Sequence, residues 1–178
     1  PKFKKAVALR VILNSRSDLN IIEDNISLML GSNSHMVIYP INKKKELNMV
    51  CIIRCKKYEP DNVKQLVQEI ILKQNSKLKN IFDNEIKTWP LYFSTKIIPS
   101  TNKKVFYIGD AFNGFLPTLA QGAGQSIESA FEIFNLLKND KLDKDNDYFE
   151  VRSKRAKIIR SRSNFNFLTF HFSNSIMQ

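Results

Sequence analysis

The chain has 178 residues, of which 43% are hydrophobic and 25% are charged. This length and balance are typical of a folded domain with a substantial core, and they exclude a disordered chain. No run of eighteen apolar residues occurs, so the sequence contains no transmembrane helix.

The formal net charge is +11, which by itself favours a nucleic-acid partner. The lysines that produce it are scattered in short clusters, such as Lys43–Lys45, Lys56-Lys57 and Lys103-Lys104, and do not follow one helix face. No recognised nucleic-acid-binding motif accompanies them. We therefore interpret the charge as a solvated surface and expect no nucleic-acid partner.

If Cys51 and Cys55 share a strand, their separation of four residues spans roughly 13 Å, which is too far for a disulfide. The sequence has only two His and no Cys-x-x-Cys pair, which argues against a metal site. Unpaired thiols are typical of a reducing compartment, so we expect a cytoplasmic location. The first residues, Pro1-Lys2-Phe3, show neither an initiator Met nor a signal peptide, and we interpret the sequence as a fragment.

Short apolar runs separated by Gly, Asn, Ser and Lys turns predict an antiparallel meander in the first half of the chain. The expected strands are Lys5–Leu13, Ile26–Leu30, His35–Ile41 and Leu47–Arg54. A helix is expected from Asp61 to about Lys73, because Asp61 can cap it and apolar residues recur at helical spacing. A shorter helix is expected over Ser76–Phe82. Because proline lacks an N–H, a further strand should begin just after Pro90 and cover Leu91–Ile98.

The second half alternates strand, loop and helix. Lys104–Ile108 has the pattern of a short buried strand, and a loop containing Pro117 follows it. A helix is expected over Gln125–Leu137. Its apolar residues share one side: Ile127, Ala130, Phe131, Phe134 and Leu137. A polar linker, Lys138–Asn146, then precedes a C-terminal helix over Phe149–Phe172.

The segment Val105–Ala130 contains the residues that we expect to bind a ligand. A strand that ends in Gly109-Asp110 places a carboxylate at the carboxyl edge of a sheet, where ligands bind in open α/β folds. Such a carboxylate can accept a hydrogen bond from a sugar or polyol hydroxyl. Pro117 fixes one turn, and Gly122 and Gly124 allow backbone amides to approach a flat ligand closely. The positive end of the following helix favours negative charge on that ligand.

This segment resembles the FAD-dependent monooxygenases that hydroxylate aromatic rings, the family of the salicylate, hydroxybenzoate and ubiquinone-pathway hydroxylases. The family signature is Gly-Asp-Ala-Ala-His, then Pro, then Ala-Gln-Gly-Ala and Ile-Glu-Asp-Ala. The matching residues stand in unbroken register: Gly109-Asp110-Ala111, Leu116-Pro117, Ala120–Ala123, Ile127-Glu128 and Ala130. Asn113 stands where the family commonly has His, and Ser129 stands where it has Asp.

A weaker resemblance covers most of the remaining chain. Upstream, Gly31-x-x-x-His35-x-x-x-Tyr39-Pro40 looks like the substrate-domain strand of the same family. Downstream, the residues that look like its C-terminal helix are Arg155, Arg160, Arg162, Asn164 and Phe170-His171. The chain thus looks like the C-terminal half of such an enzyme.

The resemblance implies an α/β fold of mixed α+β character. Residues 1–98 would be a sheet-rich portion of the substrate domain, and residues 99–138 the C-terminal part of a Rossmann-like FAD-binding domain. Residues 139–178 would form a linker and a C-terminal helix.

The resemblance also assigns cofactor-binding residues. Asp110 would bind the ribityl hydroxyls of FAD. The other residues expected to border the flavin are Gly109, Pro117, Gln121, Gly122 and Ala123.

By the same resemblance, His35, Tyr39 and Gln121 would line the substrate ring. His35 and Tyr39 are four residues apart in a strand and therefore share a face. Because imidazole titrates near neutrality, His35 could deprotonate a phenol. The simpler alternatives are a polar sheet residue for His35, a packing residue for Tyr39 and a loop brace for Asp110.

The implied activity is NADH- or NADPH-dependent hydroxylation of a phenolic or quinol-like ring with dioxygen, and a homodimer is the expected possible assembly. The Gly-x-Gly-x-x-Gly that cradles the FAD pyrophosphate does not occur in this sequence, so we expect the N-terminal half of the enzyme to be missing. The alternative is a non-catalytic flavin-fold relic that acts as a binding or assembly partner. A halogenase or reductase on the same fold is a further alternative.

Overall fold

The computed structural model describes residues 1–13, 25–73, 78–83, 85–102, 105–139 and 145–172. The chain divides into two compact units. The sheet unit consists of Lys4–Leu91 with Leu168–Gln178, and the helical unit consists of Pro1–Phe3 with Tyr92–Phe167. The division of the chain at residues 98 and 138 expected from the family stays a prediction.

A five-stranded sheet with the order β2-β3-β4-β1-β5 forms the sheet unit. Its strands are β1 (Lys2–Leu13), β2 (Ser27–Gly31), β3 (Ser34–Ile41), β4 (Glu46–Arg54) and β5 (Lys87–Phe93). The pairs β2–β3, β3–β4 and β4–β1 are antiparallel. This confirms the predicted meander for β2, β3 and β4, whereas β1 pairs with β4 and not with β2. Asn33 closes the β2–β3 turn with a φ of 63°, a left-handed conformation that Asn tolerates well.

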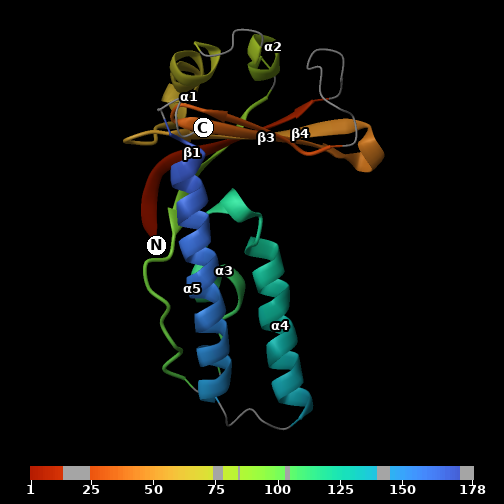
Figure 1. The fold of residues 1–178 in the computed structure, drawn as a ribbon, viewed down its shortest axis with the longest axis vertical. Coiled ribbons are helices and arrows are strands. Elements are labelled where there is room, and N and C mark those ends of the chain that lie inside the picture. The colour runs from red at the N-terminus through yellow and green to blue at the C-terminus, as the bar shows by residue number, and fades with distance from the viewer. Residues whose placement is uncertain (14–24, 74–77, 84, 103–104, 140–144, 173–178) are drawn as a thin grey trace. The chain divides into compact units, whose positions relative to one another are not determined.

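One face of this sheet carries the core. Alternate residues of β1, β3 and β4 are almost fully buried on it: Val7, Leu9, Val11, Met36, Ile38, Met49, Cys51 and Ile53. Helical turns over Pro60–Leu72, which include α1 (Val63–Leu66), and α2 (Lys79–Phe82) lie on one side of the sheet (Figure 1). Their buried residues are Val63, Val67, Ile71, Ile81 and Phe82. This confirms the predicted helix after residue 60, whereas residues 76 and 77 of the second predicted helix lie outside the described residues.

The predicted strand over Leu91–Ile98 is wrong, because β5 begins at Lys87 and ends at Phe93. Pro90 lies inside β5 and does not precede it. Since β5 is the last strand in the sheet order, one of its edges has no neighbouring strand among the described residues. Proline is tolerated there because its missing N–H can fall on the unpaired side.

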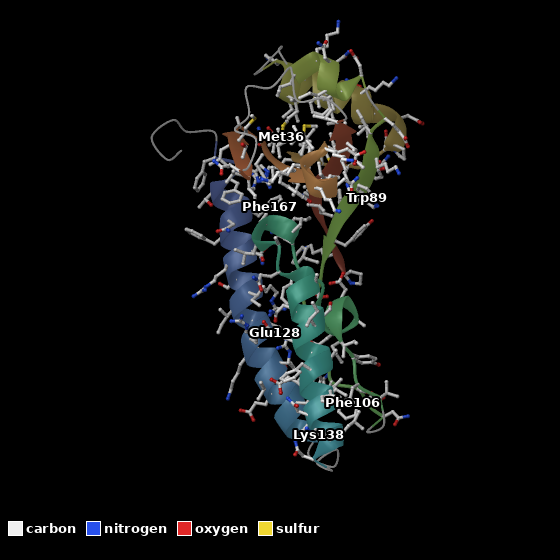
Figure 2. The ribbon with its side chains drawn as sticks, turned by 90° about the vertical axis from the view of Figure 1, so that its right-hand side faces the viewer. Met36, Trp89, Phe106, Glu128, Lys138 and Phe167 are labelled. Atoms are coloured by element: carbon white, nitrogen blue, oxygen red, sulfur yellow. The ribbon has the colours of Figure 1, made fainter. Side chains whose placement is uncertain are left out.

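The helical unit contains α3 (Gly109–Asn113), a 3₁₀ turn (Pro117–Leu119), α4 (Gly122–Lys138) and most of α5 (Asp145–Thr169). Helices α4 and α5 run side by side (Figures 1 and 2). The core of the unit is Phe112, Tyr148 and Ala156, with Phe106 and Phe149 packed against it. The Tyr148 hydroxyl donates to the Tyr107 carbonyl at 2.8 Å. None of the described helices is long and apolar enough to cross a bilayer.

The predicted buried strand over Lys104–Ile108 is also wrong. Residues 105–108 belong to no strand among the described residues, and Val105, Tyr107 and Ile108 are exposed. Ile108 nevertheless has an extended backbone, with φ −126° and ψ 162°. A strand needs a neighbour to form a hydrogen-bonded ladder, and nothing in the described residues pairs with this segment.

Helix α4 begins at Gly122, three residues before its predicted start, and ends one residue after its predicted end. The two fully buried residues of this helix, Gln125 and Ser129, are polar, and Ile133 and Leu136 pack against the core of the unit. The apolar side anticipated from the sequence is exposed: Ile127, Ala130, Phe131, Phe134 and Leu137. The apolar side of α4 therefore has no cover within the described part of the chain.

Candidate functional site

Gly109 is required by the geometry at the start of α3. Its φ is +54°, and a Cβ atom there would lie 2.5 Å from the Ser126 hydroxyl oxygen of α4. Only glycine has both the backbone freedom and the small size for this close approach of α3 to α4. Asp110 follows in the first turn of α3 and is exposed, so its carboxylate faces outward, where a ligand can reach it.

The loop before α4 presents its backbone to solvent. Pro117 is exposed, and Ala120 closes the 3₁₀ turn in a left-handed conformation with a φ of 52°. Gln121 directly precedes α4, and a Cβ atom built on Gly122 would meet nothing within 4 Å. Open space at Gly122 and an exposed Ala123 leave room for a flat ligand against this loop.

Contacts to α5 hold this loop in place. The Thr118 hydroxyl donates to the Ser163 carbonyl at 2.7 Å. The Asn166 side-chain amide donates to the Thr118 carbonyl at 3.3 Å. The backbone between Pro117 and α4 is thus supported from one side by a long helix.

A buried arginine connects the same loop to α5. Arg152 donates to Glu128 Oε2 at 2.9 Å and to Gln125 Oε1 at 2.7 Å, and its side chain is 5% exposed. Gln125 in turn donates to Gln121 Oε1 at 3.4 Å and to Glu128 Oε1 at 3.0 Å. The hydrogen bond from Arg152 is the main reason why the pKa of Glu128 lies below its usual value. Figure 2 shows Glu128 on α4 beside α5.

Sequence reasoning missed Gln125 and Arg152. The available signal was Glu128, an acidic residue within the motif that pairs well with a cationic side chain of a neighbouring helix. Asn113, which replaces the family's His, is fully buried, and neither atom of its amide has a partner among the described residues.

His35 and Tyr39 lie on the second face of the sheet. In β3 they stand opposite Ile52 and Asn48 of β4, so they share one face as their spacing predicts. Tyr39 is half-buried, whereas His35 is only 3% exposed.

His171, which follows α5, is the hydrogen-bonding partner of His35. The two rings meet at 3.0 Å between His35 Nδ1 and His171 Nε2, and Phe170 stands edge-on to His35 with ring centroids 5.2 Å apart. Burial, followed by the neighbouring His171, lowers the pKa of His35 to about 4. The imidazole of His35 is therefore neutral at physiological pH.

The same face carries two polar residues that sequence reasoning did not assign to a site. Asn48 is fully buried, and its Oδ1 accepts from Arg10 Nε at 2.5 Å. The Asn48 Nδ2 donor has no partner among the residues that the structure describes. The available signal was Arg10, which interrupts an otherwise apolar run.

The predicted site residues fall in both units. Gln121 and the proposed flavin-binding residues belong to the helical unit, whereas His35 and Tyr39 belong to the sheet unit. A single pocket that brings His35, Tyr39 and Gln121 together stays a prediction. Among the described residues, no group of three or more His, Cys, Asp or Glu could hold a metal ion.

No family model matches the sequence. Over 85 residues the chain is 36% identical to the FAD-dependent monooxygenase cfoG of Aspergillus candidus, a match that spans 45% of this chain and 20% of that protein.

Two solved structures have closely similar folds. A salicylate hydroxylase substrate complex matches with a TM-score of 0.78 and 18% identity, covering 98% of this chain and 49% of that one. HpxO of Klebsiella pneumoniae, complexed with FAD and uric acid, matches with a TM-score of 0.84 and 11% identity, covering 99% and 47%. The chain thus spans about half the length of these proteins. In its fold, and in one matched stretch of sequence, the chain is similar to FAD-dependent monooxygenases, as its motif predicts.

Proposed function

We propose that this chain is part of an FAD-dependent monooxygenase that hydroxylates a phenolic or quinol-like ring. NADH or NADPH would be the electron donor and dioxygen the oxidant. The observation that carries the proposal is the Gly109–Ala130 segment, in which a required glycine, an exposed carboxylate and an open, supported loop coincide with the family motif. The salicylate hydroxylase and the uric acid complex of HpxO support an aromatic substrate.

The residues present fit the flavin end of FAD. The exposed Asp110 carboxylate would accept hydrogen bonds from ribityl hydroxyls. The backbone of Gln121, Gly122 and Ala123 would border the ring, where the open space at Gly122 leaves room for it. The amides that open α4 would favour negative charge at that end of the ring. Bound FAD supplies the oxygen chemistry, and the protein orients and tunes it.

His35 would accept the proton of the substrate hydroxyl, which activates the ring for attack by an electrophilic oxygen. The depressed pKa of His35 keeps its imidazole neutral, which a proton acceptor requires. Tyr39 and Gln121 would position the ring by packing and hydrogen bonding.

The complete enzyme needs a pyrophosphate cradle in addition to these residues. This chain spans about half of its structural relatives, and it contains no Gly-x-Gly-x-x-Gly. We therefore propose that residues 99–138 complete an FAD-binding domain whose remaining part is contributed by a further polypeptide segment. We expect the enzyme to act in the cytoplasm, since Cys51 and Cys55 are unbridged.

The test is the variant Asp110→Ala in the complete protein. Loss of an acceptor for a bound hydroxyl costs about 1–3 kcal/mol, so FAD affinity should fall roughly 5- to 150-fold. FAD content after dialysis and the dissociation constant from flavin fluorescence measure this. The matched control is Asp83→Ala, which removes an exposed carboxylate in the sheet unit. Equal FAD retention by the wild type and both variants would contradict the proposed role.

A further inference from the structure

A cavity of about 660 Å³ lies in the sheet unit, between the helical turns over Pro60–Leu72, α2 and the first residues of β5. This volume is within the range of small-molecule sites in proteins, about 300–1,000 Å³. α1 and α2, which border the cavity, lie on the same side of the sheet (Figure 1). None of the described residues that line it is assigned to the flavin or to the substrate ring.

One wall of the cavity is a π-helix, a rare form of helix that is frequent at functional sites. It covers Val67–Leu72, and the Lys73 amide donates to the Gln68 carbonyl, five residues back, at 3.2 Å. Because such hydrogen bonds join residues five apart, Leu72 follows Val67 by about one turn and lies on the same side of the helix. The side chains of Val67, Gln68 and Leu72 all line the cavity. The π-helix thus forms one continuous wall.

The interior of the cavity is apolar. Its buried side chains are Val63, Val67 and Phe82, and Leu72 and Ile86 are half-buried. These residues come from separate segments, so a group that enters between them is enclosed on several sides. Burial of a phenyl or branched alkyl group there removes apolar surface from water and is favourable. The interior therefore fits one bulky apolar side chain.

Charged side chains of both signs form the rim of the cavity. Lys64 and Lys79 are cationic, Asp83 and Glu85 are anionic, and all four are exposed. In the part of the chain that the structure describes, none of the four makes an ion pair. A simple anion would meet two carboxylates beside the lysines, and a simple cation would meet the lysines. A ligand that carries both charges complements the whole rim.

We propose that this cavity binds a free α-amino acid with a bulky apolar side chain. The side chain would lie in the apolar interior. The carboxylate of the amino acid would accept hydrogen bonds from the two lysines, and its ammonium would donate to the two rim carboxylates. This site does not depend on the proposed hydroxylase function, since no residue of the Gly109–Ala130 segment takes part in it.

Three matched probes test which charges the cavity recognises. L-phenylalanine carries both charges, 3-phenylpropanoate lacks the ammonium, and 2-phenylethylamine lacks the carboxylate. Nitrogen-15 NMR titration of this chain identifies the residues that respond to each probe. We expect L-phenylalanine to shift the amide signals of residues 63–72, 79–83 and 85–88. Its affinity should exceed that of either analogue about tenfold, because each analogue loses one set of charge-assisted hydrogen bonds.

Two rim variants assign the charges. Lys79→Ala should weaken binding of L-phenylalanine and 3-phenylpropanoate about tenfold and leave 2-phenylethylamine unchanged. Glu85→Ala should weaken L-phenylalanine and 2-phenylethylamine and leave 3-phenylpropanoate unchanged. The matched controls are Lys56→Ala and Glu69→Ala, which remove exposed charges of the same unit that do not line the cavity. Neither control should change any of the three affinities.

Three results would overturn the proposal. Equal affinities for the three probes would show that the rim charges take no part, and signal changes confined to α4 would place binding on the exposed apolar side of that helix. The third is the absence of any signal change with millimolar L-phenylalanine. The titration uses neither FAD nor turnover, so its failure leaves the proposed function standing. Failure of the Asp110→Ala test would likewise leave this site standing.

Discussion

At Gly109 the fold depends on a single missing methyl group. Gly109→Ala should destabilise the helical unit by about 2–4 kcal/mol, because a left-handed alanine costs about 1–2 kcal/mol and overpacking adds a similar amount. The clash would be with the Ser126 hydroxyl at 2.5 Å. Urea denaturation of the chain measures the loss.

Two comparisons make the Gly109 experiment specific. Gly124→Ala lies in α4, where the added Cβ would meet only Gln121 Oε1 at 3.7 Å, so stability should be unchanged or higher. Adding Ser126→Ala to Gly109→Ala should restore part of the loss, since it removes the nearest atom. A Gly109→Ala protein as stable as Gly124→Ala would show that α3 does not approach α4 this closely.

The burial of His35 makes stability depend on pH. The unfolded chain takes up the proton near pH 6.5, whereas the folded chain does so only near pH 4. The free energy of unfolding should therefore fall as the pH is lowered from about 7 to about 4, by up to about 3 kcal/mol. Denaturation curves at several pH values measure this fall. In His35→Gln the free energy of unfolding should change less steeply with pH over that window. An identical slope would show that groups other than His35 cause the pH dependence.

At the scale of elements, Arg152 is the main polar connection between α4 and α5. Arg152→Met should cost about 2 kcal/mol, because it leaves the buried Gln125 Oε1 without its donor and Glu128 without its main partner. It should also weaken FAD binding in the complete protein, since Gln125 contacts Gln121. Chemical denaturation and FAD retention measure the two effects.

Arg155 provides the matched control for Arg152. It also faces Glu128, at 3.5 Å, but its side chain is 48% exposed. An exposed pair of this kind contributes less than about 1 kcal/mol, so Arg155→Met should be nearly neutral. Equal losses of stability in Arg152→Met and Arg155→Met would contradict the prediction that the buried arginine contributes more than the exposed one.

The elements that the sequence predicted correctly are those whose residues pack within this chain. The four strands are short apolar runs, and a short turn joins β2 to β3 and β3 to β4, so these strands could be predicted. The pairing of β1 with β4, which is distant in sequence, could not. The errors have specific causes. A strand boundary is predicted at Pro90, but an edge strand accommodates this proline. Residues 105–108 have the composition of a buried strand but find no neighbouring strand among the described residues.

The site was predictable in part for a related reason. Gly109, Asp110 and Gly122 act through local backbone geometry, which a short motif encodes. The contact between His35 and His171 joins residues 136 positions apart, and no local pattern indicates such a pairing. The same holds for Arg152, which meets Gln125 from another helix.

At the scale of the whole molecule, the apolar side of α4 is the feature that most needs an explanation. Four large side chains at helical spacing are more than half exposed: Ile127, Phe131, Phe134 and Leu137, at 71%, 62%, 57% and 55%. A stripe of this kind rarely stays uncovered on a stable monomer. Residues 105–108, in the same unit, add an extended segment without a strand partner. Both features are what a flavin-binding domain would show when the rest of its sheet is contributed by another segment.

This leads to the prediction that the 178-residue chain does not form a catalytically competent flavoprotein by itself. FAD binding in this fold is shared between the pyrophosphate cradle and the flavin-end loop, and this chain carries residues for the second. Titration with FAD, followed by flavin fluorescence, should give weak binding without NADH or NADPH oxidation. Sedimentation should show self-association that Phe131→Ser with Phe134→Ser reduces, whereas the exposed-surface control Lys138→Ser should leave it unchanged. Tight stoichiometric binding of FAD with turnover by this chain would contradict the half-enzyme interpretation, because the chain would then hold the entire cofactor without a pyrophosphate cradle.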